Sequence, residues 1–202
     1  GSMGRLESLA VQAAAIIGDT NPENASASLT IFAADHGIAA QGVSAFPQEV
    51  TGQMVANFLA SGAAANAIAA QFGIPITVVD CGIMHLPAQR DGLIDMALGR
   101  GTADSSTGPA MSPEVASKAT TQGRHFASGI ESKIVCFGEM GIANTSAAVL
   151  LAHKLSSISV AELVGRGTGL DDAGLSNKRE ILERAAARTG ELAPIEALAE
   201  VG

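Results

Sequence analysis

The chain has 202 residues, of which 47% are hydrophobic and 16% are charged, so it can bury a large core and is not predicted to be disordered. Its apolar residues are mainly small and aliphatic, with no Trp or Tyr, and this composition together with 23 Gly favours parallel α/β layers over a β-sandwich. The net charge of −8 and the scattered Lys and Arg residues argue against a nucleic-acid partner, although backbone N–H groups could still hold a small anionic ligand.

Apolar runs alternate with helical patterns along the chain. In the first half, these are a helix over 6–17, a strand over 28–34, a helix over 51–72 interrupted at Ser61-Gly62, a strand over 74–80 and a loop-rich stretch from 83 to about 113. In the second half, these are a helix that Pro113 opens with Ser112 as its N-cap, a strand over 132–137, a helix over 144–155, a strand or short helix over 159–164 and a helix over 175–188.

This strand–turn–helix order predicts a single α/β domain over 1–202, built as a Rossmann-like parallel sheet with helices on both faces. The strands are continuous apolar runs, as expected where both faces of a sheet are covered. In such a sheet, ligands collect at the carboxyl ends of the strands. Glycine and acidic residues are predicted to cluster at those ends.

The cellular setting predicted from the sequence is the cytoplasm. No apolar run approaches the roughly 18 residues that a membrane-spanning helix needs, and no signal peptide is seen, so no membrane partner is predicted. Cys81 and Cys136 each end an apolar run and are predicted to be buried, reduced residues. Cys81 and His85 lie four residues apart, but no second pair completes a tetrahedral set, so no metal site is predicted.

The segment from Gly138 to Ser146 (GEMGIANTS) is the most informative one. It follows an apolar strand and opens a helix, so free N–H groups would point into the strand-end crevice and could bind a phosphate. Glu139 would then be an acid beside an anion site, and Asn144 could cap the helix or contact the ligand. The alternative is an ordinary strand–helix turn with a surface glutamate.

A second glycine-rich segment, Gly165-Arg166-Gly167-Thr168-Gly169, is followed by two aspartates. It is interpreted as another phosphate-binding turn at the end of a strand, with Lys178 in the next helix within reach of the phosphate. The alternative is a surface loop in which Asp171 or Asp172 caps that helix.

Three further polar residues end strands. His36 could act as an acid or base, or could be a hydrogen-bonded structural histidine. Asp35 beside it and Asp80 at the end of the second strand are open to the same two interpretations. Phe46, Met54 and Phe58 could line an apolar pocket or simply belong to the core.

Read together, these segments resemble the nicotinate-nucleotide–dimethylbenzimidazole phosphoribosyltransferase (CobT) family. The stretches that carry the resemblance are GSMGRLESLA at 1–10, FAADHGIAAQGVSAFPQEVTGQMVANFLASGAAANAIA at 32–69, VVDCGI at 78–83, GTADSSTGPAM at 101–111, GEMGIANTSAA at 138–148 and VGRGTGLDD at 164–172. They occur in the family's order and cover nearly the whole chain.

The resemblance implies a Rossmann-like domain with a small helical portion, usually in a homodimer. It implies transfer of ribose 5-phosphate from nicotinate mononucleotide to 5,6-dimethylbenzimidazole, with inversion at the anomeric carbon and no metal or other cofactor. A catalytically inactive module that binds a nucleotide or an azole is the alternative, because the family's late general-base glutamate and its N-terminal helices have no counterpart in these 202 residues.

The resemblance also assigns roles to residues. Phosphate binding falls to Gly141, Gly167, Thr168 and Lys178, with Asn144 and Arg166 as further possibilities. Phe46 and Gln53 are expected to contact the benzimidazole. Glu139 is expected to be the active-site acid that faces the ribose or the base.

Overall fold

The computed structural model describes residues 2–21 and 26–202, and its centre is a parallel sheet. Within these residues the sheet has four strands in the order β3-β2-β1-β4. The strands are β1 (Ala27–Ala34), β2 (Ile76–Gly82), β3 (Leu93–Asp95) and β4 (Ile134–Met140). β1 pairs in parallel with both β2 and β4, so the carboxyl ends of the three long strands lie at one edge of the sheet.

The described residues also form helices. They are α1 (Arg5–Ile17), the 3₁₀ helix η2 (Gly37–Gln41), α2 (Val50–Leu59), α3 (Ala64–Gln71), α4 (Pro113–Ser128), α5 (Asn144–Leu155), α6 (Val160–Leu163), α7 (Asp172–Ala186) and α8 (Pro194–Val201).

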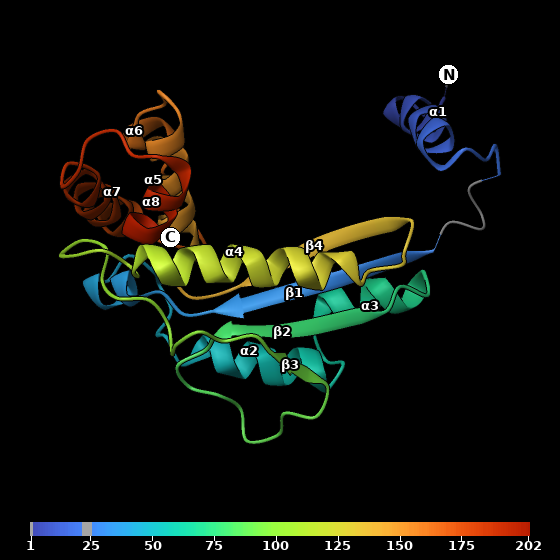
Figure 1. The fold of residues 1–202 in the computed structure, drawn as a ribbon, viewed down its shortest axis with the longest axis horizontal. Coiled ribbons are helices and arrows are strands. Elements are labelled where there is room, and N and C mark those ends of the chain that lie inside the picture. Colours follow the sequence, from blue (N-terminus) through green and yellow to red (C-terminus); the bar gives the residue numbers. More distant parts are fainter. Residues whose placement is uncertain (1, 22–25) are drawn as a thin grey trace.

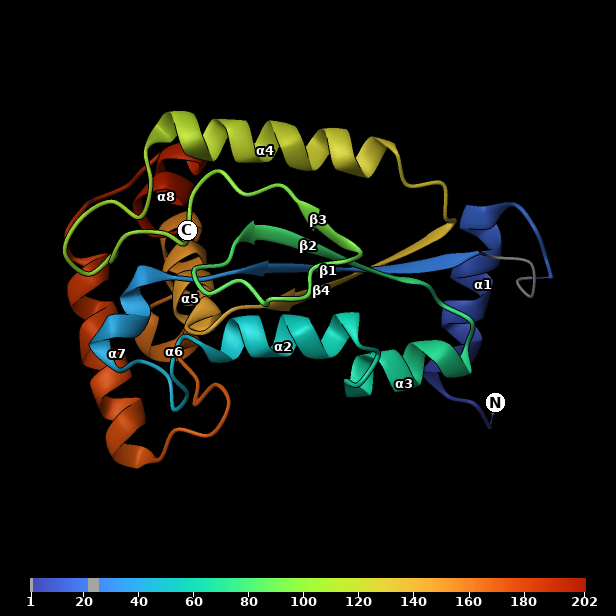
Figure 2. The ribbon, with the colours of Figure 1, turned by 90° about the horizontal axis from the view of Figure 1, so that it is seen from below.

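The sheet is covered on both faces, which confirms the predicted α/β class. Figure 2 shows α4 along one face and α2 and α3 along the other, while α5 to α8 gather beyond the carboxyl ends of the strands. On the α4 side, the rings of Phe32 and Phe126 meet edge to face with their centres 5.8 Å apart. On the α2 side, Val55 packs with Ala33 and Val78 in a buried cluster.

The helical part has its own core, which packs α5 against α7 and α8. Leu150, Leu182 and Val201 are fully buried there, together with Ile38 and Val43 from the segment that follows β1. The two cores therefore meet at the carboxyl ends of the strands. This junction is where the candidate site lies.

Several helix boundaries follow from local signals that the sequence shows. The break predicted at Ser61-Gly62 separates α2 from α3, and Ser61 adopts a left-handed conformation with φ 59°. Ser112 caps α4, because its hydroxyl accepts a hydrogen bond from the N–H of Val115 at 3.3 Å. Asp171 caps α7 by accepting from the N–H of Gly174 at 2.7 Å.

Other predictions were wrong or incomplete. Cys81 and Cys136 are exposed rather than buried. Cys136 lies on β4, an edge strand of the described sheet. The segment 159–164, left open between strand and helix, contains the short helix α6. It follows that the turn Gly165–Gly169 comes after a helix and not after a strand. The sequence patterns predict neither β3 nor α8.

The N-terminal helix α1 stands apart from the layers just described, as Figure 1 shows. None of its residues is buried, and Leu6, Leu9, Val11 and Ile16 expose their apolar side chains. Among the described residues, no helix has the length and apolar character needed to cross a membrane.

Candidate active site

The turn after β4 is packed directly against the end of β1. Ala33 and Met140 are register partners at the ends of these strands. A Cβ atom placed on Gly141 would lie 2.1 Å from the carbonyl oxygen of Ala34, so only glycine permits this approach. β4 runs through Gly138 to Met140, because β1 pairs with it that far. The turn predicted at Gly138–Gly141 therefore begins only at Gly141.

Beyond Gly141 the chain turns sharply into α5. Ala143, the N-cap residue, has φ 72° and ψ 7°, a left-handed conformation that costs a residue with a Cβ atom free energy. α5 then begins at Asn144 at the edge of the sheet. The N–H groups of Asn144 and Ser146 donate to the carbonyl oxygens of Gly141 and Ala143 at 3.1 and 2.9 Å, and within this first turn the N–H of Thr145 has no partner among the described residues. Such a helix terminus favours an anion.

A cavity of about 330 Å³ lies at this helix terminus. It brings together the two glycine-rich segments that the sequence singled out, although the whole of α5 and α6 separates them in the chain. Its walls are formed by Val43 and Ser44, by residues 139–145, by Arg166, Gly167 and Thr168, and by Lys178.

Lys178 is the most unusual group of this cavity. The residue is only 1% exposed, and its Nζ donates a hydrogen bond to Thr145 Oγ1 at 2.8 Å. Within the part of the chain that the structure describes, it forms no ion pair. Burial lowers the pKa of Lys178 from its ordinary value, because the ammonium loses its water without gaining a counter-charge. An anion in the cavity would supply that charge.

The backbone of Gly167 lies close to the ammonium group of Lys178. Its φ of 56° lies in the left-handed region, and a Cβ atom placed there would lie 3.7 Å from Lys178 Nζ. The neighbouring Arg166 lines the same cavity but is engaged elsewhere, since its guanidinium donates to the carbonyl of Leu170 at 3.1 Å and pairs with Asp172. Lys178 is thus the cation with spare hydrogen-bonding capacity.

Glu139 lies on the rim of the cavity and belongs to β4. Its register partner is Phe32, and the residue is exposed. Its carboxylate makes no hydrogen bond or ion pair with any other residue in 2–21 or 26–202. An unengaged acid beside a cavity that favours anions has a side chain free to contact a ligand.

Asp35 and Asp80 differ from Glu139, because both are buried and fully hydrogen-bonded. Asp80 accepts from the N–H groups of Gly82 and Ile83 at 2.8 Å each, and its other oxygen pairs with Arg100 at 2.8 Å. Asp35 accepts from Thr51 and from the N–H of Met84. Of the two interpretations left open, the structural one fits both aspartates, and neither lines the cavity.

His36 faces a different space. It lines a second cavity, of about 510 Å³, between α4 and the sheet. Its Nδ1 is buried and has no hydrogen-bond partner among the described residues. Burial favours the neutral ring and so lowers the pKa of His36, although the negative charge of Asp35 acts in the opposite direction.

The residues expected to contact the benzimidazole lie outside the 330 Å³ cavity. Phe46 is 48% exposed, and Gln53 is exposed on α2. Both belong to the segment that follows Val43 and Ser44, which do line the cavity. No group of three or more His, Cys, Asp or Glu residues in the described ranges is arranged to hold a metal ion.

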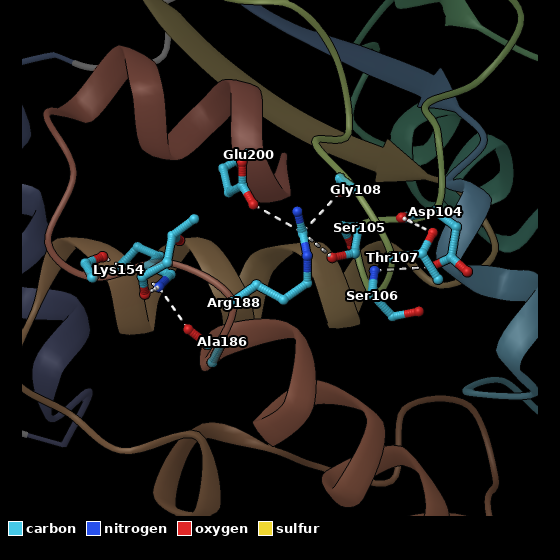
Figure 3. A network of polar contacts seen from close by, with 11 residues as sticks. Asp104, Ser105, Ser106, Thr107, Gly108, Lys154, Ala186, Arg188 and Glu200 are labelled. Atoms are coloured by element: carbon cyan, nitrogen blue, oxygen red, sulfur yellow. Dashed lines mark hydrogen bonds and ion pairs between the residues drawn. The ribbon is translucent and has the colours of Figure 1, made fainter.

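The sequence reasoning missed the network that holds the loop after β3. Arg188 donates to the carbonyls of Ser105 and Gly108 at 2.8 and 2.9 Å and pairs with Glu200 at 2.8 Å. Figure 3 shows this guanidinium between the loop and α8, with Lys154 nearby. Asp104 of the same loop accepts from Gln41 Nε2 at 2.6 Å. No local pattern could reveal partners so far apart in the chain.

The sequence model of a family described as phosphoribosyltransferase matches residues 1–202. The chain belongs to the nicotinate-nucleotide–dimethylbenzimidazole phosphoribosyltransferase family. This confirms the resemblance seen in the motifs.

Individual relatives agree. Enzymes named nicotinate-nucleotide–dimethylbenzimidazole phosphoribosyltransferase are 48% identical over 208 residues in Cupriavidus necator and 45% identical over 203 residues in Variovorax paradoxus. Each match covers 100% of this chain and 60% or 58% of the relative. The crystal structure of CobT from Thermus thermophilus superposes with a TM-score of 0.86 at 40% identity, over 100% of this chain and 62% of that one. The chain therefore spans about three fifths of the length of these relatives.

Proposed function

We propose that this protein transfers the ribose 5-phosphate of nicotinate mononucleotide to 5,6-dimethylbenzimidazole, which yields α-ribazole 5′-phosphate and nicotinate. The proposal rests on one observation above all, the buried and unpaired Lys178 in a cavity at the N-terminus of α5. Family membership supports the same reaction.

The phosphate of the mononucleotide would occupy the space between α5 and α7. Lys178 would supply its positive charge, and the backbone of Gly141, Gly167 and Thr168 would supply N–H donors. Asn144 and Arg166 line the same walls and would add contacts at the edge. Thr145 already holds Lys178 in position through its hydroxyl.

The ribose and the two bases would then lie toward the rim, where Glu139 is unengaged. In the reaction, one ring nitrogen of the benzimidazole attacks C1′ of the ribose from the face opposite to nicotinate. The bond from C1′ to the nicotinate nitrogen breaks with its electron pair, and the configuration at C1′ is inverted. The other azole nitrogen loses its proton, and Glu139 is our candidate for accepting it or for holding the ribose. Phe46 and Gln53 are proposed contacts of the benzimidazole, since both are exposed next to the segment that supplies Ser44.

We also propose that the protein works as a cytoplasmic homodimer, in one domain over 1–202, without a metal or other cofactor. The apolar side chains that α1 exposes support a contact with a second copy. Light scattering after size-exclusion chromatography would test the assembly.

The reaction itself is tested by mixing the chain with nicotinate mononucleotide and dimethylbenzimidazole and following both products by chromatography. We expect equal amounts of nicotinate and of the α-configured ribazole phosphate. Saturable binding of either substrate without turnover above background would contradict the proposal. The protein would then be a non-catalytic module that binds a nucleotide or an azole.

A further inference from the structure

Asp35 directly follows β1 with its carboxyl group completely buried, and it forms no ion pair within the described residues. Burying such a group is costly unless hydrogen bonds replace its water. Here Oδ1 accepts from the Thr51 hydroxyl at 2.6 Å, and Oδ2 accepts from the N–H of Met84 at 2.8 Å. One carboxyl group thus ties the end of β1 to α2 and to the segment after β2.

Thr51 extends this connection to the candidate site. It lies in the first turn of α2 with 0% exposure, and its Oγ1 accepts a hydrogen bond from the N–H of Ile142 at 3.1 Å. Because that N–H can only donate, the single hydroxyl hydrogen of Thr51 is left for Asp35. The polarity of the chain Ile142–Thr51–Asp35 is therefore fixed, with the carboxyl group as its final acceptor.

The surrounding backbone leaves little freedom for this contact to move. A Cβ atom on Gly52, next to Thr51, would lie 2.0 Å from the carbonyl oxygen of His85. Gly141, next to Ile142, is packed as tightly against β1, because a Cβ atom placed on it would lie 2.1 Å from the carbonyl oxygen of Ala34. The three hydrogen bonds of Asp35 and Thr51 and the close packing of the two glycines thus fix the same contact between β1, α2 and the turn after β4. Immediately after Ile142, Ala143 is held in its left-handed conformation.

We propose that Asp35 and Thr51 are positioning residues for the phosphate site. Neither lines the 330 Å³ cavity, so they act through Ile142 on the turn Gly141–Asn144. By holding the N–H of Ile142 inward, they fix the turn from which α5 starts and, with it, the position of the N–H of Thr145 in the cavity wall. This inference rests on the proposed function, since it assigns the turn a phosphate to bind.

The test uses the full chain and two variants of the same hydroxyl. Thr51→Val removes the acceptor for Ile142, whereas Thr51→Ser retains it. Thr30→Val is the matched control, because Thr30 is 3% exposed and makes no side-chain hydrogen bond among the described residues. Titration calorimetry measures affinity for nicotinate mononucleotide and for free dimethylbenzimidazole.

We expect Thr51→Val to weaken nicotinate mononucleotide by about tenfold or more, as the loss of a buried hydrogen-bond network allows, and to leave the free base within about threefold. Thr51→Ser should stay within about threefold for both, and Thr30→Val should match the unmodified protein. Equal loss of both ligands in Thr51→Val, or no loss of either, would overturn the inference.

A second readout needs no ligand. Amide hydrogen exchange followed by nuclear magnetic resonance should show that Ile142 loses protection in Thr51→Val and keeps it in Thr51→Ser. Unchanged protection of Ile142 in Thr51→Val would overturn the inference even if the unmodified protein failed to bind nicotinate mononucleotide. Such a failure by itself would count against the proposed function.

Discussion

Replacing Lys178 by methionine should make the ligand-free protein no less stable while it weakens the binding of phosphate. Methionine keeps the unbranched chain that fills the site and removes a charge that is 1% exposed and unpaired in the described structure. Two effects on the free energy of unfolding oppose each other. Thr145 loses one hydrogen bond, which costs about 1 kcal/mol, and relief from burying the ammonium offsets this cost or exceeds it.

The loss of affinity can be estimated from the contact that disappears. A hydrogen bond to a charged group contributes about 1.5–3 kcal/mol, and each 1.4 kcal/mol is a factor of ten in affinity. The dissociation constant for nicotinate mononucleotide should therefore rise roughly 10- to 150-fold, whereas that for free dimethylbenzimidazole should change little. Titration calorimetry measures both constants, and urea denaturation measures the stability.

Arg179→Met is the matched control on the same helix, since this guanidinium is half exposed and pairs with Glu183. It should leave both affinities unchanged. The reasoning is refuted if Lys178→Met binds nicotinate mononucleotide as tightly as the unmodified protein. It is also refuted if the variant unfolds several kcal/mol more easily, because Lys178 would then be a structural residue.

The same lysine predicts a dependence on pH. Its pKa in the folded protein lies below the ordinary value of 10.5, so burial of the charge destabilises the fold at pH values below the folded pKa. This penalty disappears as the pH rises through the folded pKa and past 10.5. A bound phosphate needs the charged form, so affinity should fall as the pH rises through the lowered pKa. The affinity of the Lys178→Met variant, measured over the same pH range, should not show that fall.

Three further variants test other parts of the structure. Glu139→Gln should reduce turnover by about 100-fold, as removal of a general base does, with affinity for nicotinate mononucleotide within about threefold; unchanged nicotinate release would make Glu139 structural. Ala143→Gly should raise the free energy of unfolding in urea by about 1 kcal/mol, because glycine tolerates φ 72°, and a loss of stability would contradict the strain described. Arg188→Met should lower that free energy by about 3 kcal/mol, since Glu200 would remain buried without its partner; a loss below about 1 kcal/mol would show the pair to be dispensable.

The fold was largely predictable because it rests on local patterns. Apolar runs, the Ser112 cap and the break at Ser61-Gly62 each act within a few residues. The cap and the break appear where the sequence places them, and the ends of β2 and β4 lie within three residues of the predicted strand ends. β3 has only three residues, too few for a recognisable pattern. α8 begins at Pro194, and proline is a residue typical of the first position of a helix.

The site was harder to predict, because its chemistry depends on distant partners. Asp35, Asp80 and Glu139 are all acids at or next to the carboxyl ends of strands, and the residue types around them do not show which of the three gains a distant partner. Asp35 is satisfied by Thr51 and Met84, which lie 16 and 49 residues away, and Asp80 by Arg100, 20 residues away. Glu139 has no such partner in the described structure. The sequence likewise does not predict the burial of Lys178, since a lysine on a helix is usually solvated.

The most direct measurement of the central claim is a crystal structure of the chain with nicotinate mononucleotide bound. We expect the phosphate to lie within hydrogen-bond distance of Lys178 Nζ and of the Gly167 N–H, with the ribose toward Glu139. A phosphate bound elsewhere, with Lys178 still hydrogen-bonded to Thr145 alone, would contradict the account.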